Sequence, residues 1–279
     1  MIALLIAFVF GIFASWLLRN LAARAEGRVG PPLLQPVWDL IKLFSKGSVG
    51  DVSEALPLLS LLLVAFAVIN LPSPSNWGGN LIVVLYSLTA SSIFTAIAGF
   101  ASSSPFSRVG GSRELQQTLL SELLFLAAGF SAVVAANSTS FQAIALHNHL
   151  LLFINFLMML IACQAKLRKA PFDIPDANVE VAGGPATEFS GYALGMHELT
   201  YLLELYCLPM LASFLFLGLD YTASLLASLL VILVFGGIAA LSARFSVKNS
   251  NKLLFFAFLL SMLITTILYI GGRFNGTFI

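Results

Sequence analysis

The stretch that decides the fold is residues 222–243, which read TASLLASLLVILVFGGIAALSA. It contains no charged residue, and its length matches the ~20 apolar residues that an α-helix needs to cross a bilayer. A strand of a membrane barrel would alternate apolar and polar residues with a period of two, and this run does not. We therefore predict a transmembrane helix here and apply the same window to the rest of the chain.

The composition of the whole chain agrees with a membrane protein. Of its 279 residues, 59% are apolar and 10% are charged, whereas soluble domains carry about 25% charged residues. A soluble core of this length could not bury so much apolar surface. The same composition excludes a disordered chain, a secreted disulfide scaffold and a nucleic-acid-binding domain.

Eight apolar runs meet the length requirement: residues 2–18, 55–71, 80–100, 115–136, 142–165, 192–218, 222–243 and 252–271. The expected fold is an all-α integral membrane protein, a single polytopic domain over residues 1–279 with eight transmembrane helices. An amphipathic interfacial helix is expected after the first. We interpret the first run as a retained anchor, because it lacks the preceding basic residue and the cleavage site of a signal peptide.

Basic residues separate the two sides of the membrane. Of the 14 Lys and Arg residues, 13 fall in or at the border of the links 19–54, 101–114, 166–191 and 244–251, and Arg273 is the exception. The positive-inside rule then places these four links in the cytoplasm and both termini on the opposite side of the cell (inner, cytoplasmic) membrane. The long inward links also hold most of the acids, so we expect a partner to dock on this face.

The first inward link contains a short amphipathic pattern. Gly30-Pro31-Pro32 breaks any helix, and Pro36 suits the first turn of a new one. Apolar residues then recur on roughly one helical face: Leu33, Val37, Leu40, Ile41 and Phe44. One interpretation is a helix lying at the membrane interface. The other is a docking element for a soluble subunit, with Gln35, Asp39 and Lys42 on its polar side.

Acidic residues in or beside the predicted spans are the candidate functional residues. A carboxylate in the bilayer costs at least ~2.5 kcal/mol, so such a residue is a functional hypothesis by default. The candidates for an ion-coupling chain are Glu114, Glu122, Asp173, Asp176, Glu180, Glu188, Glu198 and Glu204, with Arg113, Arg168, Lys169 and His197 as supporting residues. The alternative is that each acid pairs with a neighbouring base, as Glu114 would with Arg113, or caps a helix.

Metal and haem sites within the chain are not expected. Cys163 and Cys207 form no C-x-x-C, so the chain alone cannot bind an iron–sulfur cluster or structural zinc. His147 and His149 stand two residues apart and would face different directions on a helix, which disfavours haem ligation. His197 either joins the acidic cluster or forms a hydrogen bond within the bundle.

Three motifs, in order, carry a family resemblance. The most specific lies in the third inward link, where residues 169–180 read KAPFDIPDANVE and residues 183–191 read GGPATEFSG. The second is Gly30-Pro31 followed by Gln35-Pro36 and by DLIKL at residues 39–43, and the third is GSRE at 111–114 followed by Ser121-Glu122. Over essentially its whole length the chain resembles the H-type membrane subunits of respiratory complex I and of energy-converting (group 4) nickel–iron hydrogenases, which form one family.

This resemblance implies a non-catalytic membrane subunit with eight helices, between a peripheral redox arm and ion-pumping subunits. Family acids form a polar funnel that couples electron transfer to ion movement. The loop acids match Asp173, Asp176, Glu180 and Glu188, and the fourth-helix pair matches Arg113 and Glu122. The chain departs from the complex I pattern at four positions: Asn178 replaces a glutamate, Lys169 an arginine, Lys166 a glutamate and Phe189 a tyrosine.

Three features favour the hydrogenase branch: the short spacer Pro32-Leu33-Leu34, Glu114 directly after Arg113, and the short chain. The resemblance then implies the membrane-anchor subunit of a ferredoxin-dependent energy-converting hydrogenase that moves protons or sodium ions. The expected partners are the hydrogenase large and small (iron–sulfur) subunits on the cytoplasmic face, antiporter-like membrane subunits and the lipid bilayer, with no nucleic acid. The chain itself would hold no cofactor, and the iron–sulfur clusters and nickel–iron centre would lie in those partners.

Two other functions remain open. One is the quinone-site membrane subunit of a complex I-like NADH or other donor:quinone oxidoreductase, or of a sulfane reductase or formate hydrogenlyase relative. The other is a stand-alone secondary transporter. The absence of an inverted repeat between the two halves, together with the long motif-bearing links, argues against the transporter.

Overall fold

The structure, a computed structural model, describes residues 2–48, 54–74, 79–101, 104–145, 150–175, 184–217 and 220–274. Within these ranges every regular element is a helix, and the pairing of Asn80 with Ser140 is an isolated bridge. The elements are α1 (Ile2–Ala25), α2 (Gln35–Phe44), α3 (Ala55–Asn70), α4 (Leu81–Ala101), α5 (Pro105–Ala136), α6 (Phe141–Ala145), α7 (Leu150–Lys166), the 3₁₀ turn η1 (Gly184–Glu188), α9 (Gly191–Leu217), α10 (Tyr221–Leu241) and α11 (Val247–Phe274). The all-α prediction is confirmed.

The length and composition of the helices are those of a multi-pass membrane protein. Six helices in the described ranges are long and apolar enough to cross a bilayer, namely α1, α4, α5, α9, α10 and α11. Two further apolar helices, α3 and α7, are shorter. Each of the eight predicted runs overlaps one of these helices, and the 142–165 run also overlaps α6.

Several helices extend beyond their predicted bounds. α5 begins at Pro105 instead of residue 115, so the predicted link at 101–114 is largely helix. α1 continues to Ala25, and α11 begins at Val247. The helices are longer than the predicted runs because an apolar window detects only the most apolar part of a helix. Polar turns such as the one that carries Arg113 continue the helix outside it.

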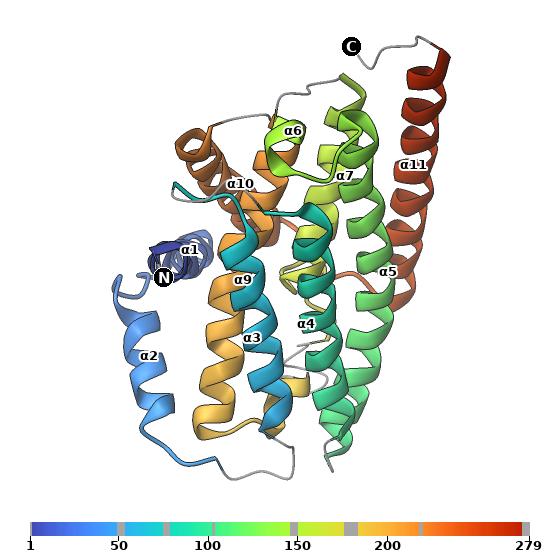
Figure 1. Ribbon diagram of the computed structural model, residues 1–279. Coiled ribbons are helices and arrows are strands. Elements are labelled where there is room, and N and C mark those ends of the chain that lie inside the picture. Colours follow the sequence, from blue (N-terminus) through green and yellow to red (C-terminus); the bar gives the residue numbers. More distant parts are fainter. Residues whose placement is uncertain are drawn as a thin grey trace.

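Helix α9 is the centre of the bundle. It packs against α1, α3, α7 and α10, and 89% of the residues in its most apolar stretch are buried. Figure 1 shows α2 at one edge of the bundle and α11 at the opposite edge, beside α5. The outward faces of α10 and α11 carry exposed apolar side chains such as Leu226, Leu230, Phe255 and Phe256. The core therefore forms around α9, and the outer helices present apolar surface to their surroundings.

Small residues let the helices approach closely, as is usual inside membranes. A Cβ atom added at Gly11 of α1 would lie 2.2 Å from the backbone oxygen of Leu202 on α9. A Cβ at Gly111 of α5 would lie 3.0 Å from the backbone of Gly99 on α4. These two contacts set the spacing of α1 and α4 relative to the helices that carry the buried acids.

We expect Gly11→Ala to destabilise the protein by about 1–3 kcal/mol, because the backbone of α9 cannot yield to the added methyl group. Gly237→Ala on α10 is the matched control, since nothing lies within 4 Å of its added Cβ. That change removes a glycine from a helix interior and should be neutral or stabilising. Thermal unfolding of both variants in detergent checks the prediction, and equal melting temperatures would contradict the close contact between α1 and α9.

Candidate functional site

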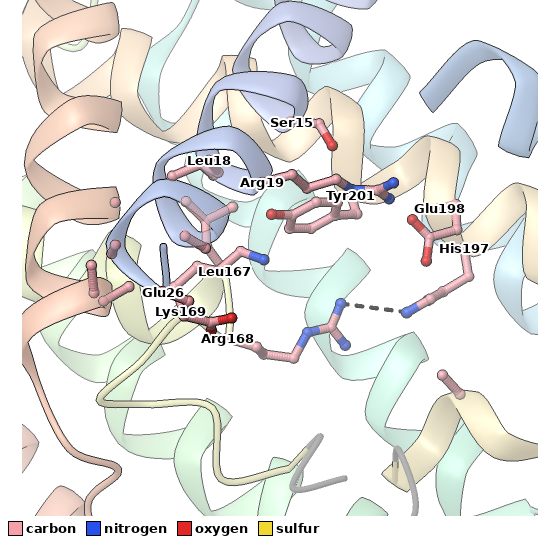
Figure 2. A pocket seen from close by; sticks show the side chains of 16 residues that line it. Ser15, Leu18, Arg19, Glu26, Leu167, Arg168, Lys169, His197, Glu198 and Tyr201 are labelled. Atoms are coloured by element: carbon pink, nitrogen blue, oxygen red, sulfur yellow. Dashed lines mark hydrogen bonds between the residues drawn. The ribbon is translucent and has the colours of Figure 1, made fainter. Parts of the chain in front are cut away.

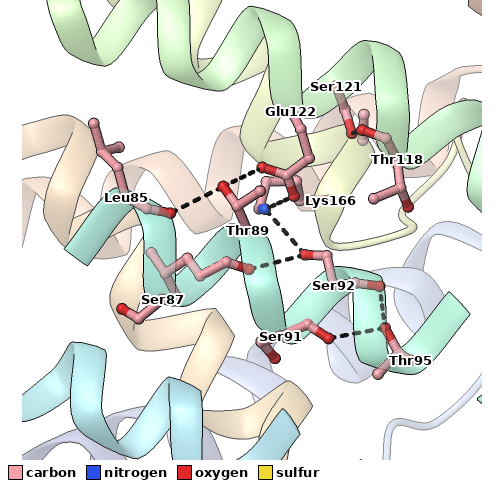
Figure 3. Close-up of polar contacts among 12 residues, drawn as sticks. Leu85, Ser87, Thr89, Ser91, Ser92, Thr95, Thr118, Ser121, Glu122 and Lys166 are labelled. Carbon is pink, nitrogen blue, oxygen red and sulfur yellow. Dashed lines mark hydrogen bonds and ion pairs between the residues drawn. The ribbon is translucent and has the colours of Figure 1, made fainter. Parts of the chain in front are cut away.

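The centre of the site is a buried ion pair between Glu122 on α5 and Lys166 at the end of α7. The Lys166 side chain is 3% exposed and that of Glu122 is 8% exposed. Thr89 on α4 donates a hydrogen bond to the second carboxylate oxygen of Glu122, at 2.8 Å. Lys166 also donates to Ser92 on α4, at 3.0 Å, and its Nζ lies 4.8 Å from the centre of the Phe125 ring. Figure 3 shows that both charged groups are held by the hydroxyl groups of α4.

A second ion pair lies next to the first. Arg168, just beyond α7, donates to Glu114 on α5 at 3.0 Å, and both side chains are largely buried. The guanidinium group also lies 3.5 Å from Nε2 of His197 on α9. Arg168 adopts a positive φ of 51°, so the chain turns sharply as it leaves α7. This turn directs the arginine back into the bundle.

Gln117 fixes the loop that follows α7. Its Nε2 donates to the backbone oxygens of Ala165, at 2.9 Å, and Phe172, at 2.8 Å. The side chain is buried on α5, between Glu114 and Glu122. One amide group thereby holds both ends of the segment that supplies Lys166 and Arg168.

Asp173 does not belong to the buried cluster. It forms an ion pair with Arg244, in the link between α10 and α11, at 2.8 Å. Phe172 packs edge-on against Phe245, and the Phe245 backbone N–H donates to the oxygen of Pro171 at 3.0 Å. Asp173 therefore fastens the motif loop to the α10–α11 link on the surface.

An open cavity of about 560 Å³ lies between α1, α9, α10 and the start of the motif loop. Figure 2 shows that it is lined by charged and polar side chains, among them Arg19, Arg168, Lys169, Glu198 and Tyr201. Nζ of Lys169 lies 4.9 Å from the centre of the Tyr201 ring. A smaller cavity of about 250 Å³ under α2 shares Arg19 and Glu198 with it. Glu198 and Lys169 thus face open space and not the buried pairs.

The predicted docking residues hold α2 against α1. Asp39 forms an ion pair with Arg19 on α1, at 2.8 Å, and accepts a hydrogen bond from Gln35, at 2.9 Å. Lys42 is exposed. Of the apolar residues of α2, Leu40 is buried, whereas Trp38, Ile41 and Phe44 are exposed. The helix therefore has an apolar face that the chain itself does not cover.

The other predicted site residues either lie outside the described residues or have no ion pair described above. Asp176 and Glu180 lie outside the described residues, as do His147 and His149. Glu188 belongs to η1, but its side chain is not among those described. Arg113 is half-buried on α5. Glu204 is buried on α9.

Sequence reasoning missed the partners of the buried acids. One interpretation paired Glu114 with Arg113, and the structure shows an ion pair between Glu114 and Arg168. The base that faces Glu122 is Lys166, which stood out in the sequence only as a departure from the family pattern. Nothing in the sequence marked Thr89 and Ser92 as partners of the charged groups, because small hydroxyl-bearing residues are common in membrane helices.

The described part of the chain shows no arrangement that would hold a metal. Its His, Cys, Asp and Glu residues form no group of three or more close enough to bind an ion. Cys163 and Cys207 are buried free thiols, and Sγ of Cys163 lies 3.7 Å from the backbone oxygen of Leu208. The site consists of paired charges and hydroxyl groups, an arrangement suited to moving charge between side chains.

Comparisons with known proteins place this chain in a family. The chain is 32% identical over 197 residues to hydrogenase-4 component C of Escherichia coli, covering 64% of this chain and 62% of that one. It is 30% identical over 213 residues to formate hydrogenlyase subunit 4 of the same organism, covering 70% and 69%. It is 32% identical over 234 residues to the H subunit of the NADH-quinone oxidoreductase of Syntrophotalea carbinolica, covering 72% and 70%.

The fold has a counterpart among solved structures. A chain of the membrane-bound sulfane sulfur reductase, an archaeal respiratory membrane complex, superposes with a TM-score of 0.80 at 24% identity, covering 96% of both chains. The family profile described as NADH dehydrogenase matches residues 1–270, almost the whole sequence. Because of this match and the relatives above, the chain belongs to the NADH dehydrogenase family, to which the motifs of its inward links had pointed.

Proposed function

We propose that this chain is the membrane-anchor subunit of a ferredoxin-dependent energy-converting hydrogenase complex, and that it couples electron transfer in a peripheral arm to proton or sodium translocation. The pair Glu122–Lys166 carries the proposal. Two charges so deeply buried in a membrane bundle cost several kcal/mol each to desolvate, and such groups in membrane helices are usually functional. The names of the two Escherichia coli relatives support the hydrogenase branch.

The site residues have distinct roles in this proposal. Glu122, Glu114 and Glu204 form the ion-coupling chain inside the bundle, balanced by Lys166 and Arg168. The loop acids Asp173, Asp176, Glu180 and Glu188, together with Glu198, connect that chain to the cytoplasmic face. Arg113, Lys169 and His197 support these acids.

The proposal includes a topology. Residues 1–279 form one polytopic domain in the cell membrane, with α3 and α7 added to the six long helices to give eight spans. The links that carry the basic residues face the cytoplasm, and both termini face the other side. α2 lies at the cytoplasmic interface, where its exposed apolar face meets lipid and Gln35, Asp39 and Lys42 lie near the docked arm. The proposed partners are the hydrogenase large and small subunits and antiporter-like membrane subunits, and the metal centres belong to the soluble subunits.

The open cavity supports a second candidate function, that of the quinone-site subunit in a complex I-like oxidoreductase. A space of about 560 Å³ lies in the usual size range of small-molecule sites. Its lining includes hydrogen-bond donors from Tyr201, Arg168 and Lys169. In this function, these groups would donate hydrogen bonds to the oxygen atoms of a lipid-soluble carrier.

Purification of the native complex through a tag on this chain distinguishes the candidates. The first is supported if a nickel-containing large subunit co-purifies and the preparation evolves hydrogen from reduced ferredoxin. Co-purification with an NADH-oxidising, quinone-reducing arm supports the second. Transport activity from this chain alone would contradict both and favour a secondary transporter.

We expect Glu122→Gln to lower ion translocation by about 100-fold or more, the size typical of losing a positioned proton-transfer group, while the complex still assembles. The amide has nearly the same shape but carries no charge and cannot accept a proton. Ion uptake into inverted membrane vesicles measures the effect. Glu54→Gln, at an exposed acid at the start of α3, is the control and should behave like the wild type. Normal uptake by the assembled Glu122→Gln complex would refute the assignment.

Asp173→Ala should loosen the motif loop, because it removes the ion pair that fastens this loop to Arg244. We expect faster hydrogen–deuterium exchange in residues 170–175 and 242–246, and less of the peripheral arm co-purifying with the membrane subunit. Asp220→Ala, at an exposed acid before α10, is the control. Unchanged exchange together with full recovery of the arm would count against the role of Asp173.

A further inference from the structure

Glu204 differs from the other buried acids. Its side chain is buried near the middle of α9, yet it forms neither an ion pair nor a hydrogen bond with the part of the chain that the structure describes. It lies within electrostatic reach of Lys166, Arg168 and Glu122. A carboxyl group therefore faces two bases that are already paired with other acids.

Glu204 and these two bases line one small cavity. Its volume is about 10 Å³, and its lining includes Glu204, Lys166, Arg168 and Gln117. That space is at about the lower limit for one water molecule. Gln117 supplies an independent reason for a water, because its Oε1 is buried without a hydrogen-bond partner while its Nε2 is fully used. A water here would donate to Gln117 and contact the carboxyl group of Glu204.

The charge balance indicates where a proton is held. Lys166 neutralises Glu122, and Arg168 neutralises Glu114, so no described base is left for Glu204. The other titratable groups nearby are the thiols of Cys163 on α7 and Cys207 on α9, which bring no positive charge. An unpaired carboxylate buried in the bundle is very costly, and such a group takes up a proton instead.

We propose that Glu204 stores a proton and exchanges it with Glu122, while the ammonium group of Lys166 moves the opposite way. In the resting state Lys166 pairs with Glu122, and Glu204 is neutral. In the exchanged state the proton has moved from Glu204 to Glu122, and Lys166 pairs with the Glu204 carboxylate. The total charge of the site is unchanged, because the proton moves from Glu204 to Glu122 while the ammonium group moves from Glu122 to Glu204. Ser92 and the Phe125 ring already contact the ammonium group and can hold it during the movement.

This exchange rests on the proposed function, because it describes how the coupling chain holds a proton between redox events. It also assigns a use to Lys166, where the complex I pattern has a glutamate. The exchange is tested by spectroscopy on the resting protein, without electron transfer or ion uptake. The experiment can therefore contradict the exchange without contradicting the coupling role, and the reverse. If the spectra agree but ion uptake does not respond to Glu122→Gln, only the coupling role is lost.

The experiment records infrared spectra of the full chain, purified from its membrane and placed in a lipid bilayer at neutral pH. A protonated carboxyl group buried from water gives a C=O stretching band that shifts in D₂O. We expect this band in the wild type and its loss in Glu204→Gln. Glu198→Gln, at an acid that faces the open cavity, should keep it.

The decisive variant is Glu122→Gln, which leaves Glu204 intact. Among the described acids, only Glu204 is then left to pair with Lys166, so Glu204 should ionise and its band should disappear as well. Persistence of the band in Glu122→Gln would overturn the exchange. Absence of any Glu204-dependent band in the wild type would overturn the proton store.

Thermal unfolding provides a second measurement that does not depend on detecting the band. Because Glu204 can replace Glu122 as the partner of Lys166, each single Gln variant should unfold close to the wild-type temperature. The double variant Glu122→Gln/Glu204→Gln leaves the ammonium group of Lys166 without a carboxylate. Its melting temperature should fall by much more than the sum of the decreases in the two single variants. Additive shifts would contradict partner exchange.

Discussion

The pairing of Glu122 with Lys166 is the interaction on which the rest of the site depends. A charge buried in a membrane bundle is tolerated only with a partner and with hydrogen bonds for its remaining polar atoms. Here the two charges come from α5 and α7, and the hydroxyl groups that complete their hydrogen bonds come from Thr89 and Ser92 on α4. Three helices are thereby held together around one pair. The neighbouring Glu114–Arg168 pair extends the same arrangement toward α9.

The positions of the charged groups divide the molecule into a buried and an open part. On the buried side, Glu114, Glu204 and the two bases line a cavity too small for anything larger than a water molecule. On the open side, Glu198, Lys169 and Tyr201 line a space large enough for a small organic molecule. Arg168 lines both spaces. In the proposed function, this shared side chain is the connection between the open cavity and the buried pairs.

The membrane helices were predictable from the sequence because burial in lipid demands long apolar runs and leaves little alternative. The helix ends were not, since the polar turns of α5 before Glu114 carry no apolar signal although they remain helical. The acids were also predictable, because a carboxylate in an apolar run is conspicuous. Their partners were not, because Lys166 meets Glu122 only after α7 has folded back against α5. Asp173 was predicted as a funnel acid by resemblance, and the structure shows it paired with Arg244 at the surface.

The most direct test of the account is the number of ions moved per electron pair by the purified complex in sealed vesicles. The comparison is between the wild type and Glu122→Gln/Lys166→Met, which removes both charges together and so leaves no unpaired one. The account predicts that the double variant still transfers electrons and moves no ions. An unchanged ratio of ions to electrons in the double variant would contradict the claim that coupling passes through this pair.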